Sequence, residues 1–273
     1  MEKPLRYYAS NQVHSCSRKS LEALGLGNRA LRLVDTDSDL RIDLGQLRHA
    51  INEDREAGWK PACIIASAGT VNTGAIDDLE ALAELAESEG VWLHVDGCIG
   101  ALLAIAPDNH HRVAGLKRAH SLAMDPHKWL HAPFDVGCML VKDAAAHHGT
   151  FAVTPEYLEK THRGIASANW LHELGLQTSR GFRALKVWMT IKEHGIDKFG
   201  RLIDQNVAQA RFLTELIEAE SDLELIVPTN INIVCFRYRR HGMDSETVKA
   251  ANIEIMLQMQ EEGTVVLSDT TVQ

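Results

Sequence analysis

Three reactive side chains follow predicted strands of this sequence, each at the point where a strand ends. They are His14, Asp96 and Lys128. In largely parallel sheets, ligands bind outside the carboxyl ends of the strands, so we expect these residues to meet at one edge of the sheet. A lysine amine placed there can attack a carbonyl carbon and form a Schiff base. A nearby aspartate can pair with the protonated nitrogen of a pyridine ring in a bound molecule.

Pyridoxal 5'-phosphate (PLP) needs this pair of groups: a lysine that holds its carbonyl carbon and an acid for its ring nitrogen. Taken singly, each residue has an ordinary structural role. A strand-end lysine is usually solvated, a strand-end aspartate usually caps the next helix, and a lone histidine usually lies on the surface or in a satisfied core position. The combination in this order is much less frequent by chance, which makes a PLP site a candidate interpretation beside these structural roles.

The elements that must position these groups alternate along the first half of the chain. Strands are predicted over 6–9, 31–34, 63–66, 91–95, 121–124 and 137–141, and helices over 15–24, 43–57 and 77–88. Leucines at helical spacing and glycines after the helices support these assignments, with Asp43 as an N-cap. The alternation predicts an α/β fold with a mainly parallel sheet covered by helices.

The second half has a different pattern. Residues 149–169 show no clear period, and a loop of that length is usually functional or mobile. Helices are then predicted over 179–194, 197–220 and 244–262, strands over 223–227 and 231–237, and the start of a strand over 264–267. We therefore expect a large domain over 1–190 and an incomplete small α+β domain over 191–273.

Composition excludes several other classes of protein. The chain has 273 residues, 45% of them apolar, and 28 basic against 37 acidic side chains give a net charge of −9. This balance argues against a nucleic-acid partner or an anionic membrane surface. No apolar segment resembles a secretory signal or reaches the ~18 residues of a membrane span. Five widely spaced cysteines without C-x-x-C spacing favour a reduced, cytoplasmic protein.

Five segments resemble motifs of the group II PLP-dependent amino-acid decarboxylases, the family of the aromatic-amino-acid, histidine and glutamate decarboxylases. The segments are SNQVHS over 10–15, AGTVNTGAID over 68–77, WLHVDG over 92–97, AMDPHKWL over 123–130 and SRGFRALKVW over 179–188. They occur in the family's order through nearly the whole chain. The resemblance implies the fold of the type I PLP-dependent transferases, which is aspartate-aminotransferase-like, and decarboxylation of an L-amino acid to the amine and carbon dioxide.

The resemblance also implies roles for individual residues. Lys128 would hold PLP as a Schiff base, Asp96 would pair with the ring nitrogen, and His14 would stack over the ring. Thr70 would hydrogen-bond near the cofactor or the substrate carboxylate. His127, beside the lysine, is a candidate for proton handling.

Three further residues complete the expected site, and the first two take their roles from the same resemblance. Tyr157 matches the tyrosine of the family's mobile loop, which protonates the carbanion, and it favours simple decarboxylation over aldehyde formation. Asp125 corresponds to a position near the cofactor phosphate, where an anion would need a compensating partner. Cys98 is small and leaves room beside the ring, and we expect it to contact the cofactor.

The family also implies a homodimer and a longer chain. Its members carry an N-terminal segment with a Gly/Ser/Thr-rich turn that cradles the cofactor phosphate, and residues 1–13 offer no such turn. The sequence thus resembles a decarboxylase core truncated at both ends.

Three alternatives remain open at this point. The first is an inactive remnant of the PLP fold, and the second is another PLP enzyme of the same fold, such as a desulfurase or an aminotransferase. The third is a metal-dependent hydrolase using His127 and His131, with His94 and Asp96 at a strand end. Pro133 lies close by and no glutamate stands within the histidine pair, so we expect no metal site.

Overall fold

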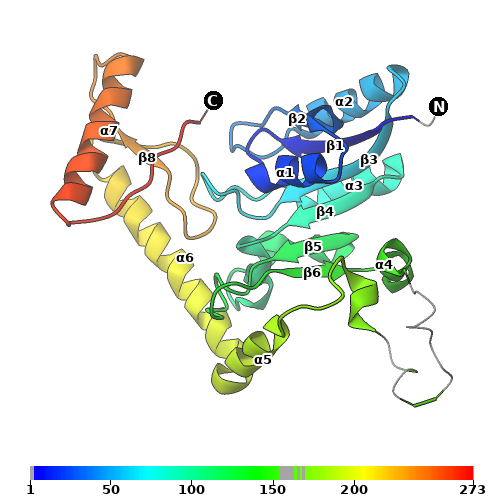
Figure 1. The fold of residues 1–273 in the computed structure, drawn as a ribbon. Helices are drawn as coiled ribbons and strands as arrows, with labels where there is room; N and C mark the ends of the chain where they lie inside the picture. Colours follow the sequence, from blue (N-terminus) through cyan, green and yellow to red (C-terminus); the bar gives the residue numbers. More distant parts are fainter. Residues whose placement is uncertain (1–2, 154–162, 165–166, 168–169, 273) are drawn as a thin grey trace.

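A computed structural model describes residues 3–153, 163–164, 167 and 170–272. Its centre is a six-stranded sheet in the order β2-β1-β3-β4-β5-β6 (Figure 1). The strands are β1 (Leu5–Ser10), β2 (Leu31–Val34), β3 (Lys60–Ser67), β4 (Trp92–Asp96), β5 (Ser121–Met124) and β6 (Cys138–Val141). Neighbours from β2 to β5 pair in parallel, and β6 pairs antiparallel with β5. The predicted α/β class and mainly parallel sheet are confirmed.

Helices cover both faces of this sheet. The helices of the described residues are α1 (Ser15–Ala23), α2 (Leu44–Glu56), α3 (Leu79–Glu89), α4 (Ala144–Phe151), α5 (Arg183–His194), α6 (Ile196–Glu218) and α7 (Ser245–Glu261), of which α1 lies on one face and α2 and α3 on the other. Successive strand residues point to opposite faces. Tyr8 and Ile64 therefore pack in the cluster that contains α2 and α3, whereas Ala9 and Ile65 pack in the cluster that contains Leu21 of α1.

Local sequence sets where the first helices begin and end. The side chains of His14, Asp43 and Asp78 each accept a hydrogen bond from a backbone N–H in the first turn of α1, α2 and α3. Gly90 ends α3 in the left-handed conformation, at φ 65°. Since Asp78 is the cap, α3 begins at Leu79 rather than at the predicted residue 77.

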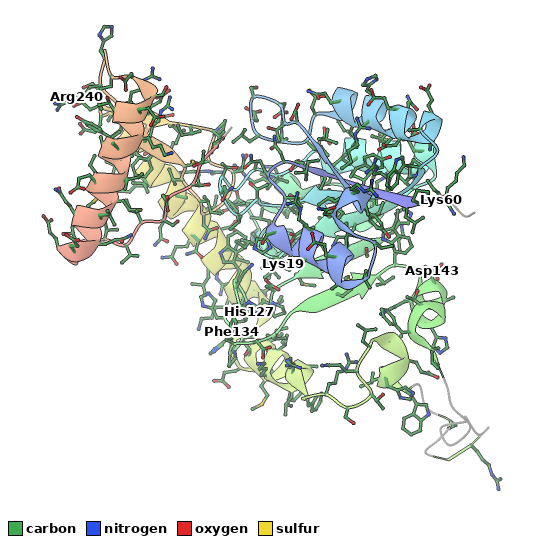
Figure 2. All side chains as sticks on the ribbon, turned by 45° about the horizontal axis from the view of Figure 1, so that its top comes forward. Lys19, Lys60, His127, Phe134, Asp143 and Arg240 are labelled. Carbon is green, nitrogen blue, oxygen red and sulfur yellow. The ribbon has the colours of Figure 1, made fainter. Side chains whose placement is uncertain are left out.

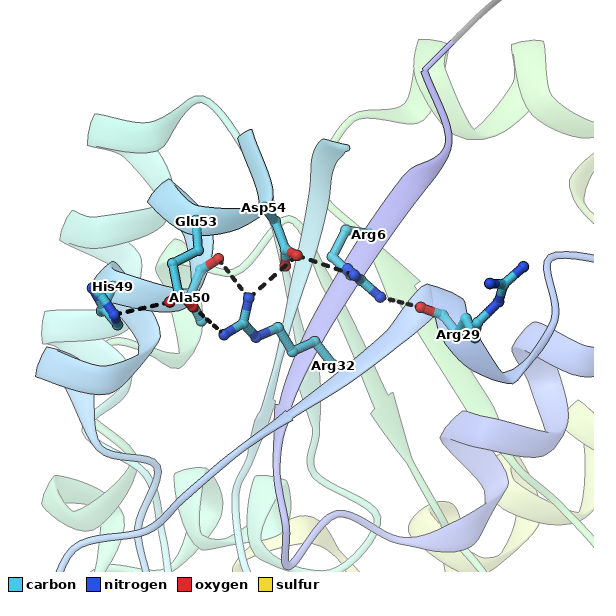
Figure 3. A network of polar contacts seen from close by, with 7 residues as sticks. All are labelled: Arg6, Arg29, Arg32, His49, Ala50, Glu53 and Asp54. Atoms are coloured by element: carbon cyan, nitrogen blue, oxygen red, sulfur yellow. Dashed lines mark hydrogen bonds and ion pairs between the residues drawn. The ribbon is translucent and has the colours of Figure 1, made fainter. Parts of the chain in front are cut away.

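A buried polar network holds α2 against the outer strands of the sheet (Figure 3). Asp54 of α2 is 3% exposed, and its Oδ1 lies 3.0 Å from Nη2 of Arg6 and 3.2 Å from Nη1 of Arg32. Arg6 also donates to the carbonyl of Arg29. Each half-buried arginine here thus has a carboxylate beside it, which offsets the cost of burying a charge.

The long helix α6 connects the sheet to the second part of the chain, where β7 (Leu223–Leu225) and β8 (Phe236–Tyr238) form an antiparallel pair beside α7 (Figure 1). A Cβ on Gly200 would lie 2.2 Å from the carbonyl oxygen of Ile105, so glycine allows α6 to approach the segment after β4. The predicted domain boundary at 190/191 falls inside α5. No helix in the described part is both long enough and apolar enough to span a bilayer.

Several predicted boundaries in the second half are wrong. The helix predicted from 179 begins at Arg183, because Gly181 interrupts the expected first turn and Phe182 gives no side-chain cap. The strand predicted over 231–237 is replaced by the short β8, because Ile231 is fully buried against Gly74 instead of pairing. The residues predicted to start a strand at 264–267 form none, and Val266 is 84% exposed.

Candidate active site

The loops after β4 and β5 are joined at the carboxyl edge of the sheet. Asp96 closes β4 and pairs in register with Ala123 of β5. The N–H of Gly97 donates to the Ala123 carbonyl at 2.9 Å, and the N–H of Asp125 donates to the Cys98 carbonyl at 3.3 Å. These bonds bring together side chains that lie about thirty positions apart in the sequence.

Lys128 and Asp125 form an ion pair at this edge. Lys128 Nζ lies 2.9 Å from Asp125 Oδ2, and the N–H of Lys128 donates to the Asp125 carbonyl, also at 2.9 Å. The next residue, Trp129, is buried in the main core and fixes the turn. The lysine side chain is 39% exposed, so its amine can be reached from solvent.

Cys98 lies among the charged groups of the two loops. Burial raises the pKa of its thiol, and the neighbouring carboxylates of Asp96 and Asp125 raise it further, while Lys128 acts in the opposite direction. The backbone N–H of Cys98 also donates to Asp96 Oδ1 at 3.2 Å. All four of these predicted site residues therefore lie in one cluster.

His14 follows the end of β1 and caps the next helix. Its imidazole is exposed, and its Nδ1 accepts the N–H of Cys16 at 3.2 Å, which caps α1. Burial raises the pKa of the Cys16 thiol, and the charge of Asp96 adds to this effect. The start of α1 thus lies within electrostatic range of Asp96, and the role of His14 toward a ligand stays a prediction.

Thr70 lies in the tight turn between β3 and α3. Its hydroxyl is buried, lies 2.9 Å from the Thr73 hydroxyl, and accepts the N–H of Ala75 at 3.1 Å. The geometry shows Thr70 stabilising its own turn. Whether it also reaches a ligand stays a prediction.

Asp77 supports this turn, a role that sequence reasoning did not assign. Its carboxylate is buried and accepts the N–H groups of Ile42 at 2.8 Å and Ser67 at 2.7 Å. It thereby ties the segment before α2 to the end of β3. The signal was present in the sequence, because Asp77 is the last residue of the AGTVNTGAID segment.

His127 is fixed by backbone contacts beside the lysine. Its Nδ1 lies 2.6 Å from the carbonyl oxygen and 3.1 Å from the backbone nitrogen of Val136. Its ring packs edge-on against Phe134 at 4.7 Å between ring centres, and Figure 2 shows the two side chains next to each other. Its Nε2 lies 3.8 Å from Asp125 Oδ2, so this nitrogen faces the cluster.

The remaining candidates are Tyr157 and, from the metal alternative, His131. Tyr157 falls outside the described residues. His131 stacks on Phe199 at 6.2 Å rather than converging with His127. Within the described ranges, no group of three or more His, Cys, Asp or Glu side chains is arranged to hold a metal ion.

The chemistry of this cluster fits the carbonyl and ring ends of PLP. A reachable amine lies on one loop, a carboxylate lies on the adjacent strand, and an exposed imidazole follows β1. These are the groups that a carbonyl carbon, a basic ring nitrogen and a flat ring face would each contact.

Comparisons with known proteins give the same indication. Residues 1–239 match the family model described as the pyridoxal-dependent decarboxylase conserved domain. An aromatic-L-amino-acid decarboxylase of Bacillus atrophaeus is 37% identical over 264 residues, covering 96% of this chain and 55% of that protein. Tryptophan decarboxylase 1 of Oryza sativa subsp. japonica is 30% identical over 274 residues, covering 98% and 53%.

Solved structures agree in fold. A crystal structure of Oryza sativa TDC with PLP and tryptamine matches with a TM-score of 0.91 at 30% identity, covering 98% of this chain and 56% of that one. Catharanthus roseus tryptophan decarboxylase in complex with L-tryptophan matches with a TM-score of 0.88 at 29% identity, covering 98% and 56%. The chain spans about half the length of the curated relatives that it matches.

Proposed function

The chain belongs to the pyridoxal-dependent decarboxylase family, and from this premise we propose that it carries the catalytic core of a PLP-dependent enzyme that converts an L-amino acid to its amine and carbon dioxide. The observation that carries the proposal is the cluster after β4 and β5. There the Lys128 amine, with Asp125 at 2.9 Å, lies beside Cys98 and the strand-end carboxylate of Asp96.

The residues of the cluster would divide the work of holding the cofactor. The Lys128 amine would bond covalently to the cofactor's carbonyl carbon, and Asp96 would keep a proton on its ring nitrogen. His14 would cover one face of the ring. Once bound, the cofactor supplies an electron-poor ring that accepts the electrons released when the Cα–carboxylate bond breaks.

Other residues would orient the substrate and move protons. His127, held by Val136 at Nδ1, has its Nε2 available beside the lysine. Tyr157 would return a proton to the substrate carbon. Thr70 would contact the cofactor or the substrate carboxylate. A site closed to water would strengthen each of these electrostatic contacts.

The substrate and the assembly are also part of the proposal. Relatives named as aromatic-L-amino-acid and tryptophan decarboxylases support an aromatic amino acid as the first substrate class to test. A cytoplasmic homodimer is proposed, with free cysteines as the support for location and exposed apolar side chains on α5 as the support for association.

Covalent trapping of PLP tests the proposal directly. The purified chain is incubated with PLP, its visible absorbance band is recorded, and borohydride reduction is followed by peptide mass mapping. We expect the modified peptide to contain Lys128, and Lys128→Ala to lose both the band and the modification. Lys142→Ala removes an exposed lysine near the sheet edge and serves as the matched control.

Product analysis then tests the reaction. With L-tryptophan, L-tyrosine, L-phenylalanine and L-glutamate as substrates, amine and aldehyde products are measured together with carbon dioxide. We expect amines without aldehydes, as Tyr157 predicts. A chain that is folded by circular dichroism yet forms no PLP adduct would overturn the proposal and favour the inactive remnant.

A further inference from the structure

Two arginines converge on one amide oxygen outside the cluster of the candidate active site. Arg112 lies in the short 3-10 helix His110–Val113, and Arg211 lies on α6. Arg112 Nε donates to Asn109 Oδ1 at 3.0 Å, and Arg211 Nη2 donates to the same oxygen at 3.2 Å. One neutral acceptor therefore holds two cationic groups together.

The surrounding contacts fix the orientation of Asn109. Its side chain is buried at 2% exposure, and its Nδ2 donates to Asp204 Oδ1 at 2.7 Å. The other oxygen of Asp204 accepts the N–H of Asp108 at 3.1 Å. The amide oxygen then points toward the arginines, and Asn109 connects them to the carboxylate of Asp204.

The two guanidinium groups have no acidic partner within ion-pair distance among the described residues. Burial lowers the pKa of Arg112, and repulsion from Arg211 lowers it further. The network of Figure 3 gives the contrast, because there Asp54 forms ion pairs with both Arg6 and Arg32. Like charges brought together without a counter-charge favour the binding of an anion.

Donor groups remain available for such an anion. Each guanidinium has five N–H donors. Arg112 uses Nε on Asn109 and Nη1 on the carbonyl of Asn230 at 2.9 Å, and Arg211 uses one donor of Nη2. Arg211 is exposed and Arg112 is half-buried, so an anion could reach both from solvent.

We propose that Arg112 and Arg211, held by Asn109, form a binding site for a phosphate group between the 3-10 helix and α6. Guanidinium groups bind phosphate oxygens through paired N–H donors, which gives both charge and geometry. The ligand is inorganic phosphate or a small phosphate monoester. Arg112 also donates to the carbonyl of Asn230. An anion bound by both arginines would therefore connect α6 to the 3-10 helix and to the segment that contains Asn230.

Calorimetric titration of inorganic phosphate at constant ionic strength tests the site. We expect the full chain to bind phosphate and Arg211→Gln to weaken that binding at least tenfold. Arg201→Gln is the matched control, because Arg201 is exposed on the same helix and its side chain forms no hydrogen bond or ion pair among the described residues. Its affinity should equal that of the unmodified chain.

Two further arms separate this site from others. Lys128→Ala should keep the same phosphate affinity, since phosphate bound at the cofactor site would respond to that change and not to Arg211→Gln. A titration with glycerol phosphate distinguishes a monoester ligand, if it binds more tightly, from free phosphate, if it binds more weakly. Absence of phosphate binding by the full chain, or equal binding by Arg211→Gln, would overturn the proposal.

Discussion

Asp125 places a negative charge where sequence similarity predicts the cofactor phosphate to lie nearby. The structure gives this carboxylate a partner, Lys128, at 2.9 Å. That pairing also occupies the amine that would have to bond to PLP. Two effects of Asp125 would thus both weaken PLP binding, since the carboxylate pairs with the amine and would repel a phosphate bound nearby.

Replacing Asp125 by asparagine should therefore strengthen PLP binding. A partly exposed ion pair contributes up to about 1 kcal/mol, which corresponds to about fivefold in the dissociation constant. Absorbance titration with PLP measures it, with Asp269→Asn as the control because Asp269 is exposed and has no charged partner among the described residues. Weaker binding by Asp125→Asn would show that the carboxylate positions the lysine productively.

Asp77 makes the stability of the protein depend on pH. Burial raises the pKa of its carboxyl from 3.8 to about 6, although two backbone N–H donors oppose the shift. The folded protein thus binds this proton more tightly than the unfolded chain. The resulting stabilisation is fully present below pH 4 and is lost as the pH rises through about 6.

The size of the effect follows from the shift, at about 1.4 kcal/mol per pKa unit, or about 3 kcal/mol in all. Urea unfolding at pH 4, 5, 6 and 7 should show a decline with rising pH that Asp77→Asn lacks. The variant should also be less stable at every pH. The asparagine amide has only one oxygen, so it cannot accept both N–H groups as the two carboxylate oxygens do. Parallel pH profiles for the two proteins would contradict the assignment.

At the scale of elements, the segment after β4 is held against the end of β3 by close backbone contact. A Cβ on Gly100 would lie 2.2 Å from the carbonyl oxygen of Ala68, and neither backbone can yield without moving a strand end. Gly100→Ala should therefore destabilise the fold by about 3 kcal/mol and weaken PLP binding by displacing Asp96.

Gly149→Ala is the matched comparison for this change. Gly149 lies within α4 and has nothing within 4 Å of an added Cβ, so alanine should stabilise the helix by about 0.5–1 kcal/mol. Urea midpoints of the two variants should move in opposite directions. Equal stability of Gly100→Ala and the unmodified chain would show that the segment adapts.

The elements also show which structure local sequence can specify. β1 to β5 and the first three helices were predictable, because short apolar runs, leucine spacing and capping aspartates are all local signals. The position of Ile231 was not predictable, since its burial against Gly74 depends on two segments far apart in the chain. The helix start at Arg183 was missed because Gly181 outweighed a serine that looked like a cap.

The candidate site also combines features that local sequence predicts with features that it does not. The strand-end rule brought Asp96 and Lys128 to one edge from sequence alone. The Lys128–Asp125 ion pair and the contact of His127 with Val136 depend on side-chain positions that no spacing encodes. No local pattern predicts that Arg112 and Arg211 converge, because ninety-nine positions separate them.

At the scale of the whole molecule, α5 carries apolar side chains that the described residues leave uncovered. Trp188 is 59% exposed and Met189 is 56% exposed, and the preceding Phe182 is 73% exposed. α5 lies at the end of α6 opposite to α7 (Figure 1). Exposed apolar side chains gathered in this way are typical of surfaces that contact another protein.

We expect this surface to mediate self-association into a dimer. Light scattering after size exclusion should give twice the mass of one chain, and the double change Trp188→Glu with Met189→Glu should give the mass of one, since two buried carboxylates per copy oppose association. Leu257→Glu changes an exposed leucine on α7 and should leave the dimer intact. A monomeric unmodified chain would exclude self-association, and a double variant that remains dimeric would place the contact on another surface. Either result contradicts the prediction, because the contact predicted here requires the side chains of Trp188 and Met189 to leave water.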